Sequence, residues 1–243
     1  MKTRLKIIAC LIWITGFVAF ISFQIHSSAN SNSSKSDTGK TNPKPDKVQV
    51  EKFDKALQER FFTEPSFGIR RLEPAYKPNP HFENFDFVQF NPKTKEEQLS
   101  IEAFEKEDWK VSLYLFGRRA IPQDANEKEP KEFNIQYRLN RPLLVTKNVK
   151  IKQVTNPGKF REEIKSAFDS FQNPSSPNYE NYEFSVGKWS YVARPVRAAN
   201  ESCIKCHTDY VALPQPGTDE YQFRRRQVGD ANGILVYGFA KDK

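Results

Sequence analysis

Methionine, cysteine and histidine are all scarce in this chain of 243 residues. The only methionine is Met1, and the other possible ligand residues are three cysteines and three histidines: Cys10, Cys203, Cys206, His26, His81 and His207. A structural zinc site takes four cysteine or histidine ligands, usually as two spaced pairs. Cys10 and His26 lie in or beside an apolar N-terminal run, so the second half of such a site is missing from the body. We therefore expect no structural zinc centre.

A strong basic character is also lacking in the body of the chain. Lysine and arginine exceed aspartate and glutamate by eight. Lys2, Arg4 and Lys6 contribute three of these charges and residues 27–50 two more, which leaves only about +3 for the rest. So small an excess argues against a nucleic-acid partner. We expect the local cluster at residues 224–226, three arginines in a row, to be a solvated turn.

One pentapeptide, Cys203-Ile204-Lys205-Cys206-His207, indicates a specific chemistry. Two cysteines three residues apart and followed by histidine form the signature for covalent attachment of c-type haem. The two thiols would add to the two vinyl groups, and His207 would be the proximal iron ligand. A thioredoxin-like pair would need a βαβ pattern that is absent, and a disulfide across so short a loop would be strained. We therefore expect one covalent haem c.

The N-terminus predicts export. Three basic residues precede an apolar run over residues 7–23, which is longer than a typical signal-peptide core and close to the length that spans a bilayer. Residues 1–26 are thus a signal anchor or a signal peptide, with a possible cleavage site at residues 27–29. The positive flank stays in the cytoplasm. We expect the protein in a bacterial inner membrane with its body in the periplasm or, after cleavage, soluble in the periplasm.

The remaining chain divides into a linker and one domain. Residues 27–46 are polar, with too little apolar surface to fold, and predict a disordered linker. Residues 47–243 mix helical and strand patterns and predict an α+β domain, a central antiparallel sheet with flanking helices. Helices are expected at 47–62, from the Thr94 and Glu97 capping box to 106, and after Asn156-Pro157. Strands are expected at 109–121, 133–146 and 233–240, a hairpin at 182–194 with its turn at Gly187-Lys188, and a loop at 74–92.

The scarcity of methionine also limits which residue can be the second axial ligand of the haem iron. With Met1 alone, a mature carrier with His/Met ligation is excluded. His81 is the only other histidine in the folded body and is our candidate for the distal position. A vacant or water-filled site, or a lysine or tyrosine ligand, remains open. Arg194 and Arg197, shortly before the pentapeptide, are candidates for pairing with the haem propionates.

Three segments, residues 189–196, 201–207 and 228–234, resemble the haem-c-binding domain of unknown function with a PAS-like fold. That resemblance covers about residues 182–240. It implies a PAS-like sheet that holds covalent haem, thioether bonds at Cys203 and Cys206, and His207 as proximal ligand. It also implies redox or gas sensing at an extracytoplasmic surface. No kinase, cyclase or receiver pattern follows, so a sensor would need a separate signalling partner.

Two classes of function follow from these patterns. The first is an exported monohaem c protein, tethered to the membrane, that acts in electron transfer or in redox or gas sensing with a partner protein. The second is a haem enzyme of the peroxidase kind, which would need an open iron face and distal acid–base groups. No residue of this chain is assigned a catalytic role, and we regard the first class as the better supported.

Overall fold

The computed structural model describes residues 42–63, 87–124, 130–139, 142–147, 154–206 and 210–241. All of them belong to one unit, Thr41–Lys243. The predicted signal segment, most of the predicted linker, His207 and the segment that carries His81 lie outside the described residues. None of the described helices is long and apolar enough to cross a membrane, and the apolar run at residues 7–23 lies outside the described residues.

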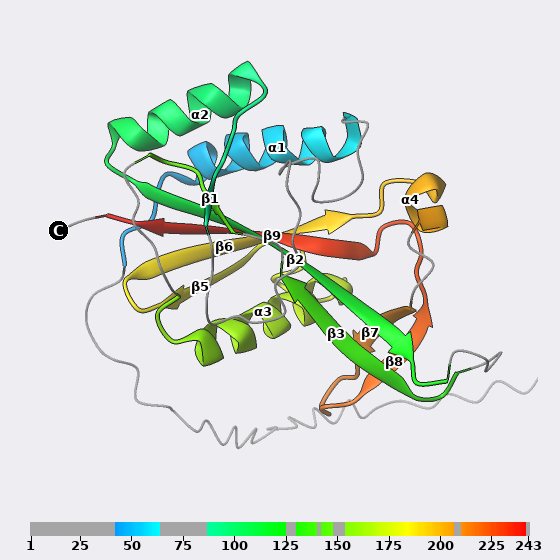
Figure 1. Cartoon of the computed structure of the whole chain (residues 1–243). Helices are drawn as coiled ribbons and strands as arrows, with labels where there is room; N and C mark the ends of the chain where they lie inside the picture. The colour runs from blue at the N-terminus through cyan, green and yellow to red at the C-terminus, as the bar shows by residue number, and fades with distance from the viewer. Residues whose placement is uncertain are drawn as a thin grey trace, which may run out of the picture. The chain divides into compact units, whose positions relative to one another are not determined.

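The described residues form a mixed α+β fold around a large, mostly antiparallel sheet, as expected (Figure 1). Its main strand order is β1-β4-β2-β9-β6-β5, and only β1 and β4 pair in parallel. The strands are β1 Val88–Gln89, β2 Lys110–Pro122, β3 Phe133–Leu139, β4 Leu143–Leu144, β5 Tyr182–Val186, β6 Trp189–Arg197, β7 Tyr210–Pro214, β8 Tyr221–Arg225 and β9 Ala231–Ala240. The helices are α1 Lys47–Thr63, α2 Lys95–Lys106, α3 Pro157–Gln172 and α4 Glu201–Cys206.

Helices cover both faces of the sheet, with α1 and α2 on one side and α3 on the other (Figure 1). Successive strand residues point to opposite faces, so the central strand β9 contributes to two cores. Ile234 and Val236 pack with the apolar face of α3. Leu235, Tyr237 and Phe239 pack against α1 and α2. Because β9 is buried on both faces, its sequence is almost continuously apolar.

The helix starts follow the predicted capping residues. Thr94 caps α2 by accepting the backbone N–H of Glu97, and Asn156 caps α3 by accepting the N–H of Lys159. In a complete capping box the Glu97 carboxylate would also accept the backbone N–H of Thr94, but the structure differs. The Glu97 carboxylate accepts the N–H of Lys93 and pairs with Arg60 of α1. Glu97 therefore connects two helices as well as supporting its own first turn.

Three strand assignments differ from the sequence prediction. The strand expected at residues 133–146 is divided into β3 and β4, with Pro142 immediately before β4. Proline cannot donate a ladder hydrogen bond, which favours such a break. The segment at 210–225 carries no strand prediction from the sequence, yet it forms the β7–β8 hairpin, which joins β2 through Ala120 and Tyr210. The loop expected at 74–92 also contains the short strand β1.

Candidate functional site

The cysteine pair lies on α4, the short helix between β6 and β7. Asn200 stands immediately before this helix, and its Oδ1 accepts the backbone N–H of Ser202 at 3.0 Å and that of Cys203 at 3.4 Å. The Ser202 hydroxyl also donates to Asn200 Oδ1, at 2.6 Å. The Asn200 side chain thus fixes the first turn of α4.

Cys203 carries a free thiol and is half-buried. Cys206 is the last residue of α4, three positions further on. Positions three apart in a helical turn share one face. The backbone positions of Cys203 and Cys206 therefore lie on one side of α4. His207 follows directly and lies outside the described residues.

The chain before α4 is held by the turn that leads into β9. Ala198 donates its N–H to the Asp230 carbonyl at 2.9 Å and accepts the N–H of Gly229 at 2.8 Å. Asp230 is buried, and its carboxylate accepts two 2.7 Å hydrogen bonds from Arg224 and one from the backbone N–H of Gln227. Because Asp230 links β8 to the start of β9, the entry to α4 is anchored to the central sheet.

An aromatic cluster includes Tyr210, which follows the pentapeptide by three residues in the sequence. Tyr210 begins β7, and its ring centroid is 4.8 Å from that of Phe133 on β3. Phe133 in turn stacks on Phe223 of β8 at 4.3 Å. All three rings are partly exposed, and none of them belongs to either of the two cores. We call Tyr210, Phe133 and Phe223 the aromatic shelf. The Arg225 guanidinium lies 4.4 Å above the Tyr210 ring.

A polar network fastens the β7–β8 hairpin to β2 and α3. Arg118, whose side chain is 3% exposed, pairs with Asp169 of α3 and donates to the Ala212 carbonyl of β7. The Tyr221 hydroxyl donates to the other oxygen of Asp169 at 2.9 Å. Burial and then the Asp169 carboxylate raise the pKa of the Tyr221 phenol, so Tyr221 stays a protonated donor. The shelf is therefore presented by a well-anchored hairpin.

The two arginines proposed for the propionates contact opposite faces of the sheet. Arg194 lies 3.6 Å from Glu51 of α1. Arg197 donates to the Phe171 carbonyl at the end of α3 and to the Tyr179 carbonyl, and its guanidinium covers the Tyr179 ring at 3.8 Å. Both guanidinium groups already interact with protein groups. Pairing with propionates stays a prediction for both.

Within the described part of the chain, no three cysteine, histidine, aspartate or glutamate residues gather in a way that could hold a metal ion. His81 and His207 both lie outside that part. Axial ligation by His81 and His207 therefore stays a prediction.

The solvated turn expected at residues 224–226 is wrong. Arg226 is only 4% exposed and donates to the Ala231 carbonyl and to Asn232 Oδ1, while Arg224 binds Asp230. Sequence reasoning missed Asp230 and Arg118 as well. The alternation of Tyr221 and Phe223 before the arginines was the available signal that this segment is a strand.

Comparison with known proteins places the chain in a family. Residues 89–239 match the family described as Tll0287-like. This chain belongs to the Tll0287-like family. The match covers more than half of the chain and includes both cysteine positions of α4, His207 and the aromatic shelf, whereas α1 precedes it. No curated protein and no solved structure shows significant similarity to this Tll0287-like chain.

Proposed function

We propose that this Tll0287-like protein is an exported monohaem c-type protein, tethered to the membrane by residues 1–26, that acts in electron transfer or in redox or gas sensing. The observation that carries the proposal is the Cys203 thiol. It is free, half-buried and one turn before Cys206, in a pentapeptide that ends with His207. An exported protein seldom leaves two neighbouring cysteines without a covalent role.

The chemistry of the donor set fits a covalent haem. Cys203 and Cys206 would form the thioether bonds, His207 would bind the iron, and His81 is the proposed distal ligand. Haem supplies one-electron chemistry at its iron. The protein supplies attachment through α4, which Asn200 and the Asp230 turn hold in place.

The aromatic shelf is a second observation in favour of the proposal. Three clustered rings that belong to neither core remain partly exposed, and one of them, Tyr210, lies three residues after His207 in the sequence. Apolar patches of this kind, bordered by polar groups, commonly mark a surface that binds another apolar group. We propose that the shelf excludes water from one side of the macrocycle, with Arg225 at its border. We also propose that the sheet has a PAS-like fold.

The location of α1 suggests how the domain could signal. α1 follows the linker that leads from the proposed anchor, and Gln58 of α1 donates to the Pro195 carbonyl of β6 at 3.1 Å. β6 leads into α4 through residues 198–200. A change at α4 would therefore reach α1 through one strand, and a separate redox or signalling partner would receive it.

Co-expression with a periplasmic haem-ligation system tests the proposal. Purified protein should carry one haem that survives acid–organic extraction, and the double variant Cys203→Ala, Cys206→Ala should lose it. Haem that is extracted from the wild type, or that remains covalent in the double variant, would overturn the proposal. In the same preparation a six-coordinate low-spin spectrum supports electron transfer, whereas a high-spin spectrum supports the peroxidase-like alternative.

A further inference from the structure

The Asn200 side chain contacts the Cys203 thiol as well as the backbone of α4. Its Oδ1 lies 3.7 Å from Cys203 Sγ, a distance at which the thiol donates a weak hydrogen bond. The same oxygen accepts the backbone N–H groups of Ser202 and Cys203 and the Ser202 hydroxyl. One amide oxygen therefore restrains both the start of α4 and the side chain of one of its two cysteines.

These four contacts are local. Each of them joins Asn200 to a residue two or three positions further along the chain. Hydrogen bonds from an asparagine side chain to the residues that follow it do not depend on tertiary packing. The arrangement can therefore form before the domain has folded, and it is available whether haem is attached to the folded or to the unfolded chain.

The contacts are compatible with a thioether at Cys203. In the proposed attachment Sγ bonds to the vinyl carbon next to the macrocycle, the thiol hydrogen is replaced by a hydrogen added to the terminal vinyl carbon, and the vinyl double bond becomes a single bond. The S–H bond breaks, and no oxidant or reductant is consumed because the thioether contains all the atoms of thiol and vinyl group. Asn200 Oδ1 loses only its most distant donor and keeps the other three.

We infer that Asn200 is a positioning residue for the thioether at Cys203: its amide oxygen holds the thiol beside the first turn of α4, where the vinyl group is added. The inference rests on the proposed function, since it requires covalent haem. It also distinguishes the two cysteines, because Cys206 lies six positions after Asn200, beyond the turn that the amide caps. Loss of the Asn200 amide should therefore impair attachment at Cys203 more than attachment at Cys206.

Ser202 competes with the Cys203 thiol for the same oxygen. A carbonyl oxygen has two lone pairs, and four donors surround Asn200 Oδ1. The Ser202 hydroxyl is the nearest of them, at 2.6 Å. Removal of this hydroxyl leaves Oδ1 more available to the thiol, so Ser202→Ala should preserve attachment at Cys203, whereas Asn200→Ala should weaken it.

The position of the thioether bonds tests the inference. The full-length protein is co-expressed with a periplasmic haem-ligation system for a short induction, free thiols are alkylated, and peptide mass spectrometry shows which cysteine carries haem. Asn200→Ala should raise the share of haem attached through Cys206 alone by at least about threefold, as expected for the loss of one modest hydrogen bond. Ser202→Ala should not raise that share.

Two further substitutions separate positioning of the thiol from capping of the helix. Glycine at a helix N-cap costs little stability, so Asn200→Gly keeps the start of α4 but removes the amide oxygen. This variant should raise the Cys206-only share as Asn200→Ala does. Asn200→Asp keeps an oxygen acceptor at the same position and should give the wild-type share.

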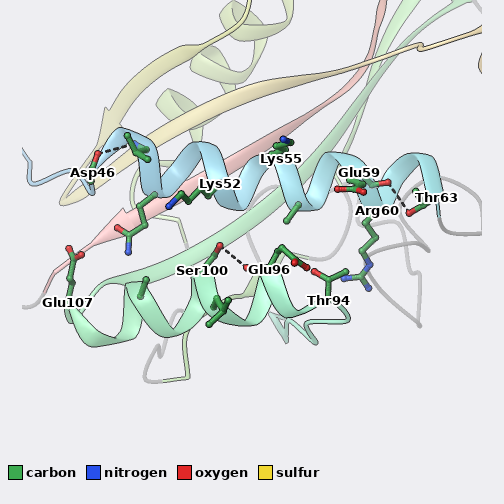
Figure 2. Close-up of a pocket in the computed structure, with 15 residues that line it drawn as sticks. Asp46, Lys52, Lys55, Glu59, Arg60, Thr63, Thr94, Glu96, Ser100 and Glu107 are labelled. Atoms are coloured by element: carbon green, nitrogen blue, oxygen red, sulfur yellow. Dashed lines mark hydrogen bonds between the residues drawn. The ribbon is translucent and has the colours of Figure 1, made fainter.

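Thr94→Ala is the matched control at another helix start. Thr94 caps α2 by accepting the backbone N–H of Glu97 at 3.1 Å, far along the chain from the pentapeptide (Figure 2). Its loss should leave both thioether bonds as in the wild type.

The inference is overturned if Asn200→Ala and Asn200→Gly keep the wild-type share, or if they lower attachment at the two cysteines equally. It is also overturned if Asn200→Asp or Ser202→Ala behaves like Asn200→Ala. In each of these cases two thioether bonds in the wild type would leave the proposed function standing. Wild-type protein without covalent haem would refute the proposed function and this inference together.

Discussion

Arg60 of α1 and Glu97 of α2 form an ion pair of 3.2 Å whose side chains are 2% and 0% exposed. Arg60 also lies over the Phe90 ring, and Glu97 accepts the backbone N–H of Lys93. The pair therefore connects the end of α1, the start of α2 and the segment that follows β1. Because both charges are buried, removal of one partner leaves the other uncompensated.

We expect Glu97→Gln to lower the free energy of unfolding by about 3 kcal/mol, since Arg60 would keep a buried charge without its counter-ion. Urea unfolding followed by tryptophan fluorescence measures this. Glu96→Gln, one residue earlier and exposed, is the matched control and should change stability by less than about 0.5 kcal/mol. Equal effects of the two substitutions would show that the pair contributes little.

The interface between α1 and the sheet should depend on pH through Asp54. Its carboxylate accepts the Tyr237 hydroxyl at 2.7 Å, and Gln58, Arg194 and Glu51 surround it. Burial raises the pKa of Asp54 above its ordinary 3.8, and the Tyr237 hydrogen bond opposes this shift only in part. Below pH 3.8 the carboxyl is neutral in both states. As the pH rises through the raised pKa, ionisation favours the unfolded chain and stability falls.

Asp54→Asn removes that ionisation while Oδ1 can still accept the Tyr237 hydroxyl. We expect the variant to lose less stability than the wild type between acidic and neutral pH, as measured by urea unfolding at several pH values. Asp219→Asn on the exposed β7–β8 turn should keep the wild-type profile. If Asp54→Asn is destabilised relative to the wild type more at neutral pH than at acidic pH, the expected direction of the pH dependence is wrong.

The network around Asp169 should determine how firmly the β7–β8 hairpin is held. Asp169→Asn removes the counter-ion of buried Arg118 and should cost on the order of 2–3 kcal/mol. Tyr221→Phe removes one hydrogen bond and should cost about 1 kcal/mol. Hydrogen exchange of residues 210–225 measures local opening. If the two variants exchange alike, the Arg118 ion pair does not anchor the hairpin.

Much of the fold was predictable because apolar periodicity reflects burial directly. The helical spacing of Phe160, Ile164 and Phe168 identified α3, and the nearly continuous apolar run at 233–240 identified β9. Gly187, with φ of +58°, marked the turn of the β5–β6 hairpin. These features depend on neighbouring residues alone.

The β7–β8 hairpin was not predictable in the same way, because β8 carries partly exposed rings and arginines and β7 has only two fully buried apolar residues, Val211 and Ala212. Arg226 is buried only because carbonyls from residues distant in the sequence, such as that of Arg118, surround it. The pentapeptide at 203–207 was predictable from spacing, whereas the Asp230 turn that holds its entry depends on tertiary contacts.

His81 as distal ligand is tested by spectroscopy. With wild-type haem protein in a low-spin state, His81→Ala should give a high-spin spectrum and allow carbon monoxide to bind the reduced protein readily, because an axial imidazole is lost. Substitution of the other N-terminal histidine, His26→Ala, should change neither. If the wild type binds carbon monoxide as fast as His81→Ala, His81 is not a ligand and the open-site alternatives gain support.

The number of thioether bonds is the most direct test of the central claim. The alkaline pyridine spectrum of a haem protein reports how many vinyl groups are saturated. We predict two for the wild type, one for Cys203→Ala and for Cys206→Ala alone, and no attached haem when both are replaced. A wild-type spectrum with both vinyl groups intact, or two saturated vinyl groups in either single variant, would contradict attachment at α4.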